Sequence, residues 1–492
     1  MWVRGCSVAG KSRMGKVRLA LGAGGLLHGV VCGAALGALC LAAGSLAQAE
    51  TMDQALIKAY ETNPQLNSQR AVVRQTDEGV PQALSGYRPT VTVTGTGGQD
   101  YLSEVARTTA PNGAAIYPRA NFGFGATSLG ATATETVFNG FRTGNRVRQA
   151  ESNTSAARET LRVAEQTILL NAATAYMDLL RDAALLELQR RNVEVLQEQL
   201  RQTRDRFIVG EVTRTDVAQA ESRLAQGRAT VLSAEAQYAR SKATYRQVIG
   251  LEANNLQPAS PVDRLTPKRI LDAIDIARTR HPSVGVAMFG IDAAVLQVKI
   301  SEGSLYPTVT LNASVQQQSP SPAFPSDLQV FNAFVQAQVT VPIYQGGQEY
   351  SVIRQAKEFV GQKRIDLDTA RDQVQANVVI AWGQLDAAKA QILATQAQVA
   401  AAEIALNGVR EEARVGQRTT LDVLNAQQEL VNARVALVTA QHDRVVASYT
   451  LLAAVGELNL PKLGIASPLY DPMVHYQQVR DAWIGVRTPD GR

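Results

Sequence analysis

The side chains that could carry out chemistry in this sequence are few and lie far apart. Beyond residue 49 the chain has no cysteine and three histidines, His281, His442 and His475, whose spacing suits no metal site. It has no Walker motif and no nucleophile elbow. The sequence therefore predicts neither an enzyme nor a site for a metal or another cofactor.

Two short polar segments repeat one pattern, in which a Val-Gly pair precedes a threonine and, three residues later, an aspartate. They are Val209-Gly210, Thr213 and Asp216, and Val415-Gly416, Thr419 and Asp422. Glycine often ends a helix, and a threonine side chain can accept a hydrogen bond from the free backbone N–H groups of the next helix. Each segment is predicted to be a tight turn between two helices, with Thr213 or Thr215 capping the helix after the first turn.

These turns belong to an internal repeat. At an offset of 206 residues, Asp216-Val217 matches Asp422-Val423, and further upstream, at an offset of 218, Pro89-Thr90-Val91-Thr92 matches Pro307-Thr308-Val309-Thr310. The first copy therefore has 12 extra residues, in or near a loop at residues 99–119. We expect a first repeat at 50–250, a linker at 251–266, a second repeat at 267–457 and a tail at 458–492.

Each repeat is predicted to contain a helix, two strands, a very long helix, the turn and a returning helix. The predicted ranges are 52–84, 89–101, 120–137, 143–207 and 216–249 in the first repeat, and 268–304, 307–318, 329–342, 348–413 and 422–455 in the second. A helix over 143–207 would be on the order of 95 Å long. Apolar residues recur in it at spacing seven, which is typical of a coiled coil: Ala172, Leu179, Leu186, Val193, Leu200 and Phe207.

The predicted strands alternate apolar and polar residues, which indicates a sheet with two faces in different solvents. No segment after residue 49 has the ~18 consecutive apolar residues of a transmembrane helix, so a membrane would have to be crossed by a barrel. Four strands are too few to close one, since single-chain barrels need about eight or more. The sequence therefore favours a barrel to which several chains contribute.

The N-terminal 49 residues have the features of a secretory signal peptide. Five basic residues precede an apolar run that ends in Ala47-Gln48-Ala49, a typical cleavage site, and Met1 or Met14 could be the start. The chain has 49 Lys and Arg and 44 Asp and Glu. Without the five basic residues of the leader, 44 of each remain, so the predicted mature chain is neutral and no nucleic-acid partner is expected.

The two turn segments, at residues 206–217 and 415–424, resemble the periplasmic hairpin tips of the TolC family, and the order of elements is similar along the whole mature chain. This resemblance implies a homotrimer in the outer membrane of a Gram-negative bacterium. Its fold would be mainly α, with four transmembrane strands per chain in a shared β-barrel and long coiled-coil helices in a periplasmic tunnel. An inner-membrane transporter and a periplasmic adaptor would be its partners in exporting drugs, other small molecules or proteins.

The resemblance also implies roles for individual residues. Arg418, with Thr215 and Asp216, matches a network that closes the tunnel entrance. Only the second repeat has this cation, because Val212 occupies the equivalent position of the first. The simpler interpretation is that Asp216 and Asp422 stabilise the positive ends of their helices.

Three further expectations concern the tip surface. Asp422 matches a lumen-facing acidic position, and crowding around a three-fold axis would raise the pKa of such a ring. The family often has a second acid three residues later, where this sequence has Asn425. Val209, Gly210, Val415 and Gly416 are expected to form the surface that meets the adaptor, and they also suit plain helix C-caps.

A periplasmic coiled-coil adaptor or scaffold without a barrel is the main alternative. It explains the leader and the long helices, but it leaves the two strand pairs, each at the same place in its repeat, without a role. The sequence does not indicate which substrate or which transporter this chain would serve, nor whether the entrance closes with Asn425, and with Ala413 where the family often has an aromatic residue.

Overall fold

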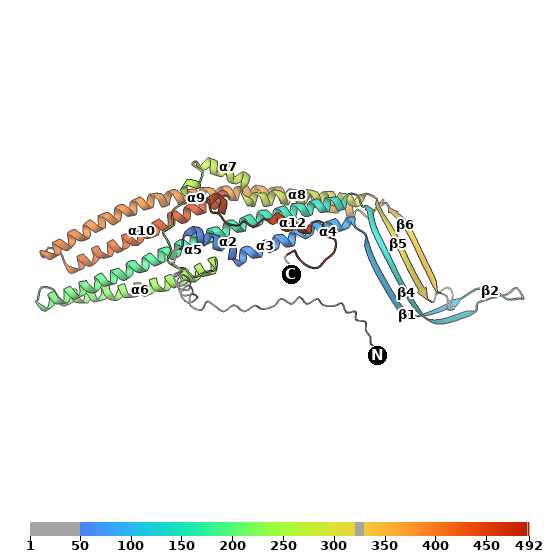
Figure 1. Cartoon of the computed structure of the whole chain (residues 1–492), viewed down its shortest axis with the longest axis horizontal. Coiled ribbons are helices and arrows are strands. Elements are labelled where there is room, and N and C mark those ends of the chain that lie inside the picture. Colours follow the sequence, from blue (N-terminus) through green and yellow to red (C-terminus); the bar gives the residue numbers. More distant parts are fainter. Residues whose placement is uncertain (1–49, 320–328, 490, 492) are drawn as a thin grey trace, which may run out of the picture. The chain divides into compact units, whose positions relative to one another are not determined.

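The computed structural model describes residues 50–319, 329–489 and 491, so the predicted signal peptide lies outside the described residues. Both halves of the chain have the same order of elements (Figure 1). The first half contains α2 (Met52–Thr62), α3 (Pro64–Asp77), α4 (Gly79–Leu84), β1 (Thr90–Val105), β4 (Arg119–Phe138), α5 (Arg142–Ile208) and α6 (Arg214–Ile249). The second half contains α7 (Ile270–Arg280), α8 (Pro282–Glu302), β5 (Thr308–Ser319), β6 (Val330–Thr340), α9 (Gln348–Arg414) and α10 (Thr420–Val455).

The long helices have identical lengths in the two repeats. Helices α5 and α9 each have 67 residues, which corresponds to about 100 Å, and α6 and α10 each have 36. The heptad seam of α5 is confirmed over most of its length, since Ala172, Leu179, Leu186 and Leu200 are buried. Phe207 at the end of the seam is 44% exposed, because the partner helix α6 begins only after the turn.

The short helices differ from their predictions. The single helix expected at residues 52–84 is divided at Asn63 and Glu78, and the helix expected at 268–304 is divided at His281. Asn63 and His281 both precede a proline, which disfavours a helical conformation for the residue before it. Both side chains instead cap the following helix, with Asn63 accepting from Gln65 and His281 accepting from Ser283.

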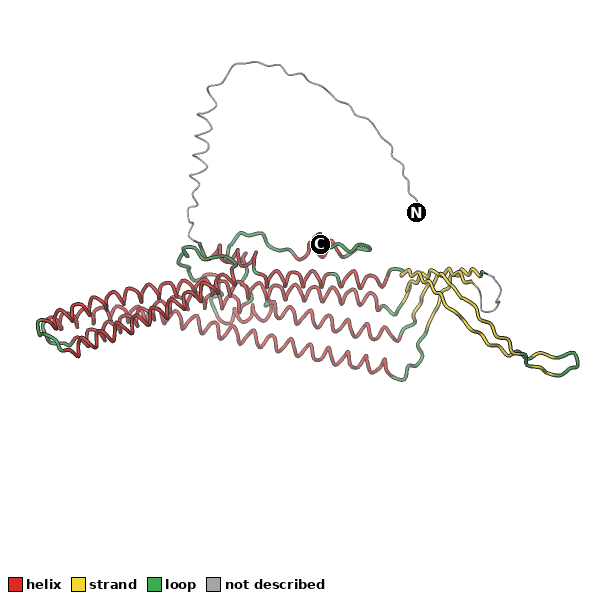
Figure 2. Tube along the Cα trace, turned by 90° about the horizontal axis from the view of Figure 1, so that it is seen from below, coloured by secondary structure: helices red, strands yellow, loops and turns green. Residues whose placement is uncertain are grey.

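A helical wall continues directly into a sheet. Helices α3–α4, α5, α8 and α9 lie side by side in that order (Figure 2). The sheet order is β1-β4-β5-β6, all antiparallel. Each wall helix thus connects to the strand at its own place in the order: α4 to β1, β4 to α5, α8 to β5 and β6 to α9. Within the described chain, the outer edges of β1 and β6 have no strand partner.

The two faces of the sheet differ in polarity. One row across the four strands is apolar and its neighbour is polar: Val91, Ala133, Ala313 and Val335, and then Thr90, Thr134, Asn312 and Gln336. On the polar face Thr134 Oγ1 donates to Asn312 Oδ1 at 3.0 Å. On the apolar face Val335 is 74% exposed. An exposed apolar face opposite a polar one is the pattern of a sheet between lipid and water.

The extra residues of the first repeat form strand where a loop was expected. The pairing of β1 with β4 continues from Thr90↔Thr134 to Val105↔Arg119, well into the range 99–119. Two short strands, β2 (Thr108–Thr109) and β3 (Ala115–Ile116), pair beyond it. The connection between β1 and β4 is therefore shorter than the loop expected at 99–119, because the glycines at positions 95, 97 and 98 do not interrupt the ladder.

The segment Ile270–Leu305 is long and apolar enough to cross a membrane, with a mean hydropathy of 1.5. It has no run of ~18 consecutive apolar residues, because Asp292 and Gln297 interrupt it. In the structure its helix α8 lies between α5 and α9 in the helical wall.

The tail and the linker pack against helices of the first repeat and against α10. The tail after α10 contains α11 (Leu460–Leu463) and α12 (Pro472–Val479). Leu458, Leu460 and Ile465 join α2, α5 and α10 in the largest apolar cluster. Tyr176 at its centre donates to the backbone oxygens of Glu50 and Gln257 at 2.8 and 2.7 Å, which ties both the start of the described chain and the linker to α5.

Candidate functional site at the hairpin tips

Both hairpin tips have the same backbone geometry. After α5, Gly210 has a φ of +82° and its N–H donates to Phe207 O at 3.0 Å, while Glu211 N–H donates to Arg206 O at 2.9 Å. After α9, Gly416 has a φ of +80° and the equivalent bonds are present. These two bonds form the Schellman arrangement, which satisfies carbonyl groups left free at a helix end.

Each returning helix begins with a capping box. Thr213 N–H donates to Asp216 Oδ2 at 2.8 Å and Asp216 N–H donates to Thr213 Oγ1 at 3.3 Å, and the same pair of bonds joins Thr419 and Asp422. Thr213 is therefore the cap, and Thr215 lies exposed in the first turn of α6. The helix-end interpretation of both aspartates is correct at the level of one chain.

Within one chain, the pKa of Asp422 is lowered from its usual value. The backbone N–H and then the side chain of Thr419 bond to its carboxylate, and these hydrogen bonds lower the pKa below its usual value. Such bonds favour the charged form. Within one chain, Asp422 is thus a stably ionised carboxylate at the tip.

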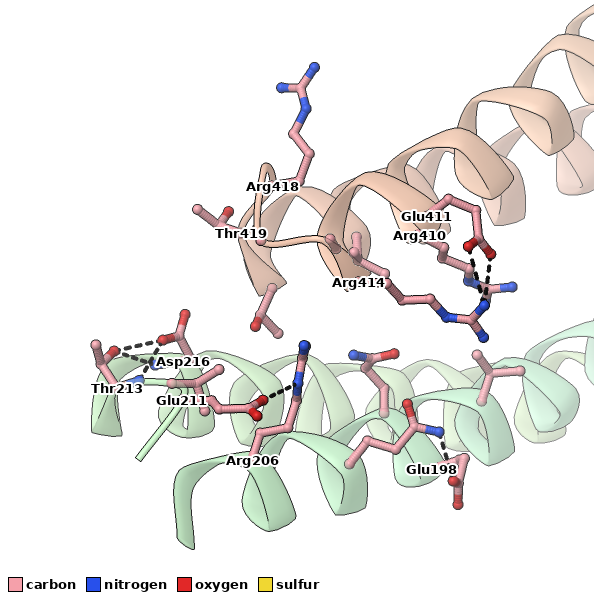
Figure 3. Close-up of a pocket in the computed structure, with 18 of the residues that line it drawn as sticks. Glu198, Arg206, Glu211, Thr213, Asp216, Arg410, Glu411, Arg414, Arg418 and Thr419 are labelled. Atoms are coloured by element: carbon pink, nitrogen blue, oxygen red, sulfur yellow. Dashed lines mark hydrogen bonds and ion pairs between the residues drawn. The ribbon is translucent and has the colours of Figure 1, made fainter. Parts of the chain in front are cut away.

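A charged cavity of about 900 Å³ lies between the two tips (Figure 3). Helices α5 and α6 form one side, and α9 and α10 form the other. Both signs of charge line it: Glu194, Glu198, Glu211, Asp216 and Glu411, and Arg206, Arg410, Arg414 and Arg418. The cavity contains the predicted gate residues Arg418 and Asp216 but not Asp422 or Asn425.

In each tip an ion pair connects the end of the long helix to the turn that follows. The arginine comes first in the sequence of the first tip, and the glutamate comes first in the second. In the first, Arg206 Nε donates to Glu211 Oε2 at 3.1 Å, and in the second, Arg418 Nε donates to Glu412 Oε2 at 2.8 Å. Arg418 points away from the α5–α6 tip in Figure 3. The expected contact between Arg418 and Asp216 is therefore absent within one chain, because each side chain has a nearer partner on its own hairpin.

A polar contact that the sequence did not predict joins the two hairpins. Arg223 Nη2 on α6 donates to Asn425 Oδ1 on α10 at 2.9 Å. Beside it, Leu424 is 3% exposed and packs with Leu200 and Leu224 of the other hairpin. Within one chain, Asn425 therefore links α10 of the second hairpin to α6 of the first.

The ends of the hairpins expose apolar side chains. Ile208 is 81%, Val209 70% and Val415 73% exposed, although each adjoins a helix end. Around Gly210 and Gly416 no side or main chain lies within 4 Å of where a Cβ would be. The tips thus offer small, apolar and accessible surfaces.

The histidines have structural partners. His281 caps α8, His442 Nε2 lies 2.9 Å from Asp178 Oδ1, and His475 Nδ1 lies 3.0 Å from Asp77 Oδ2. Among residues 50–319, 329–489 and 491, no three His, Cys, Asp or Glu side chains form a group that could hold a metal ion. The tips thus offer exposed charged and apolar side chains, which suit contacts with another protein surface.

Comparison with known proteins shows to which family this chain belongs. The sequence pattern of the family described as outer membrane efflux protein matches residues 55–251 and 273–457. This chain belongs to the outer membrane efflux protein family. The resemblance to TolC is thereby confirmed, and so are the outer-membrane location and the class of efflux and secretion channels.

Relatives of this efflux-family chain cover nearly all of it. Outer membrane efflux protein BepC of Brucella suis biovar 1 is 42% identical over 450 residues, which are 91% of this chain and 94% of that protein. Outer membrane protein TolC of Escherichia coli K12 is 28% identical over 432 residues, 84% of each. Members of the family are channels rather than enzymes.

Solved structures show the same fold. The outer membrane protein VceC of Vibrio cholerae superposes with a TM-score of 0.67 at 20% identity, over 82% of this efflux-family chain and 96% of that one. The CmeC outer membrane channel of Campylobacter jejuni gives 0.69 at 16% identity, over 87% and 89%. The mainly α fold with a small sheet and two repeats is thus the fold of this family.

Proposed function

We propose that three copies of this chain form one export channel, without catalytic activity, that works with a periplasmic adaptor and an inner-membrane transporter. One observation carries the proposal: a sheet with an apolar face and two unpaired edges continues, strand by helix, into a wall of long helices. A backbone in lipid must have all its hydrogen bonds satisfied, so β1 of one copy would pair with β6 of the next.

The relatives are named for more than one cargo. They include an efflux protein of Brucella suis and the proteases secretion protein PrtF of Dickeya chrysanthemi, which is 29% identical over 56% of this chain. The proposed cargo is therefore small molecules, proteins or both. The barrel would lie in the outer membrane with the helices in the periplasm, and no nucleic acid would be involved.

The tips would serve as docking surface and gate. The exposed Val209, Gly210, Val415 and Gly416 suit the apolar side chains of an adaptor hairpin. Arg418 would close the entrance by exchanging Glu412 for Asp216 and the neighbouring Thr215. Asp422 would present a carboxylate to cations at the same end, with Asn425 behind it. A gate of this kind needs two arrangements of similar free energy, and alternative ion-pair partners provide them.

Removing Arg418 and removing Glu412, the two members of one ion pair, are expected to affect conductance differently. Arg418→Ser removes the proposed latch and should raise the single-channel conductance in planar bilayers several-fold. Glu412→Gln removes the competing partner and should keep the conductance at or below the wild-type value, because Arg418 is then free for Asp216.

Arg414→Ser is the matched control for this experiment. Arg414 lies on the same tip but pairs with Glu411 at 3.0 Å, one turn back along α9. Its loss should leave conductance unchanged. If Arg418→Ser also leaves conductance unchanged, Arg418 has no role in closing the entrance.

A further inference from the structure

The C-terminal arm, residues 471–487, is held firmly along one edge of the helical wall. Its helix α12 packs along α3, where His475 Nδ1 lies 3.0 Å from Asp77 Oδ2 and Asp77 is fully buried. The guanidinium of Arg158, from α5, lies 4.9 Å from the ring centre of Tyr476. A buried carboxylate with partners on two other elements fixes the position of α12.

The end of the arm reaches the junction between the wall and the sheet. Arg88 Nη1 donates to Ala482 O at 2.8 Å, and its guanidinium lies 4.4 Å from the ring centre of Trp483. Arg88 is two residues before the first residue of β1, Thr90. Trp483 is thus placed beside the edge strand of the sheet.

The arm carries apolar side chains that nothing in the described chain covers. Trp483 is 69%, Ile484 97% and Val486 100% exposed. A tryptophan held by a cation and a backbone contact, with its other face free, is typical of an interface anchor. Leaving this cluster in water would forgo the free energy of burying it.

A matching apolar cluster lies on the opposite edge. Ile343 is 85%, Tyr344 76% and Tyr350 52% exposed, where β6 leads into α9. Both clusters lie at the junction of wall and sheet, one beside β1 and the other beside β6. Any ring that pairs β1 of one copy with β6 of the next brings the two clusters to the same seam.

We infer that the C-terminal arm is a strap between subunits, in which Trp483 and Ile484 pack on Ile343, Tyr344 and Tyr350 of a second copy of this chain. The inference rests on the proposed trimer. The arm would then cover the boundary between neighbouring subunits at the level where the sheet joins the helical wall. Lipid is the other surface that could cover the cluster, and the test below separates the two.

Disulfide cross-linking tests the strap directly. All three cysteines, Cys6, Cys32 and Cys40, lie in the predicted signal peptide, so the mature chain offers a cysteine-free background. The double variant Ile484→Cys/Tyr344→Cys, oxidised in membranes, should migrate mostly as covalent dimers and trimers on heated, non-reducing gels. Each single variant should stay monomeric, as should Ile484→Cys/Leu393→Cys, since Leu393 is 70% exposed, close to the 76% of Tyr344, but lies far along α9.

Tryptophan quenching provides the second measurement. In a Trp382→Phe background in liposomes, Trp483 should be shielded from acrylamide and not quenched by brominated phospholipids. Strong quenching by these lipids, without cross-links, would overturn the strap in favour of a lipid anchor. Absence of cross-links while unheated wild-type protein still runs as a trimer would overturn it as well. If the wild-type protein is itself monomeric, the proposed function fails and the strap fails with it.

Discussion

Val335→Arg is expected to abolish the outer-membrane form of this protein, whereas Gln336→Arg in the next position is expected to leave it intact. Val335 lies at the centre of β6 on the apolar face, in line with Val91, Ala133 and Ala313. An arginine facing lipid at the membrane midplane costs about 2–4 kcal/mol. In an oligomer every copy bears that cost, so assembly should fail.

Gln336 is the matched control because its side chain lies on the other face of the same strand, beside Asn312. A charge there would face water. The measurement is the amount of heat-modifiable oligomer in the outer-membrane fraction. Equal losses for both variants would contradict the assignment of the two faces to lipid and water.

Gly140→Ala is expected to destabilise the fold far more than Gly346→Ala, although the two glycines are equivalent in the repeat. Their φ values are +66° and +65°, so both variants have the left-handed backbone penalty of about 1–2 kcal/mol. Only at Gly140 is space also missing. There a Cβ would collide with the carbonyl oxygen of Gly303 and lie 2.8 Å from the Cβ of Tyr306. Overpacking of this kind costs a further ~1–3 kcal/mol.

Samples are incubated at increasing temperatures before gel electrophoresis, and the readout is the temperature at which the oligomer band is replaced by the monomer band. Gly79→Ala is a second control, since that glycine lies in a helix with nothing within 4 Å of its Cβ position. The close contact joins the β4–α5 and α8–β5 connections, which belong to different repeats. If Gly140→Ala and Gly346→Ala dissociate at the same temperature, that contact is not important for stability.

The sequence predicted the long elements well because their signals are local and extended. Heptads without proline define α5 and α9, and alternation defines the strands. The repeat then provides a second, independent copy of each signal. The short helices were less predictable, because one residue is enough to separate two of them. Asn63 ends α2 and caps α3, and His281 ends α7 and caps α8. The β1–β4 hairpin was predicted but is longer than expected, because the pairing between its two strands continues past the glycines at positions 95, 97 and 98.

The tip geometry was predictable for the same reason. A glycine, a threonine and an aspartate at fixed spacing determine the Schellman turn and the capping box within about ten residues. The partners of Arg418 and Asn425 were not predictable, because they depend on which side chains of other turns and hairpins come near. The reversed charges Arg206 and Glu412 at equivalent positions were the available signal for the Arg418–Glu412 pair.

The most direct test of the channel itself is the mobility and conductance of the wild-type protein. Membrane fractionation, followed by gels of unheated and heated samples and by planar-bilayer recording, measures location, oligomeric state and pore together. We predict an outer-membrane trimer that collapses to a monomer on heating and gives discrete conductance steps. A monomer released by osmotic shock, with no conductance, would contradict the account and favour a soluble periplasmic scaffold.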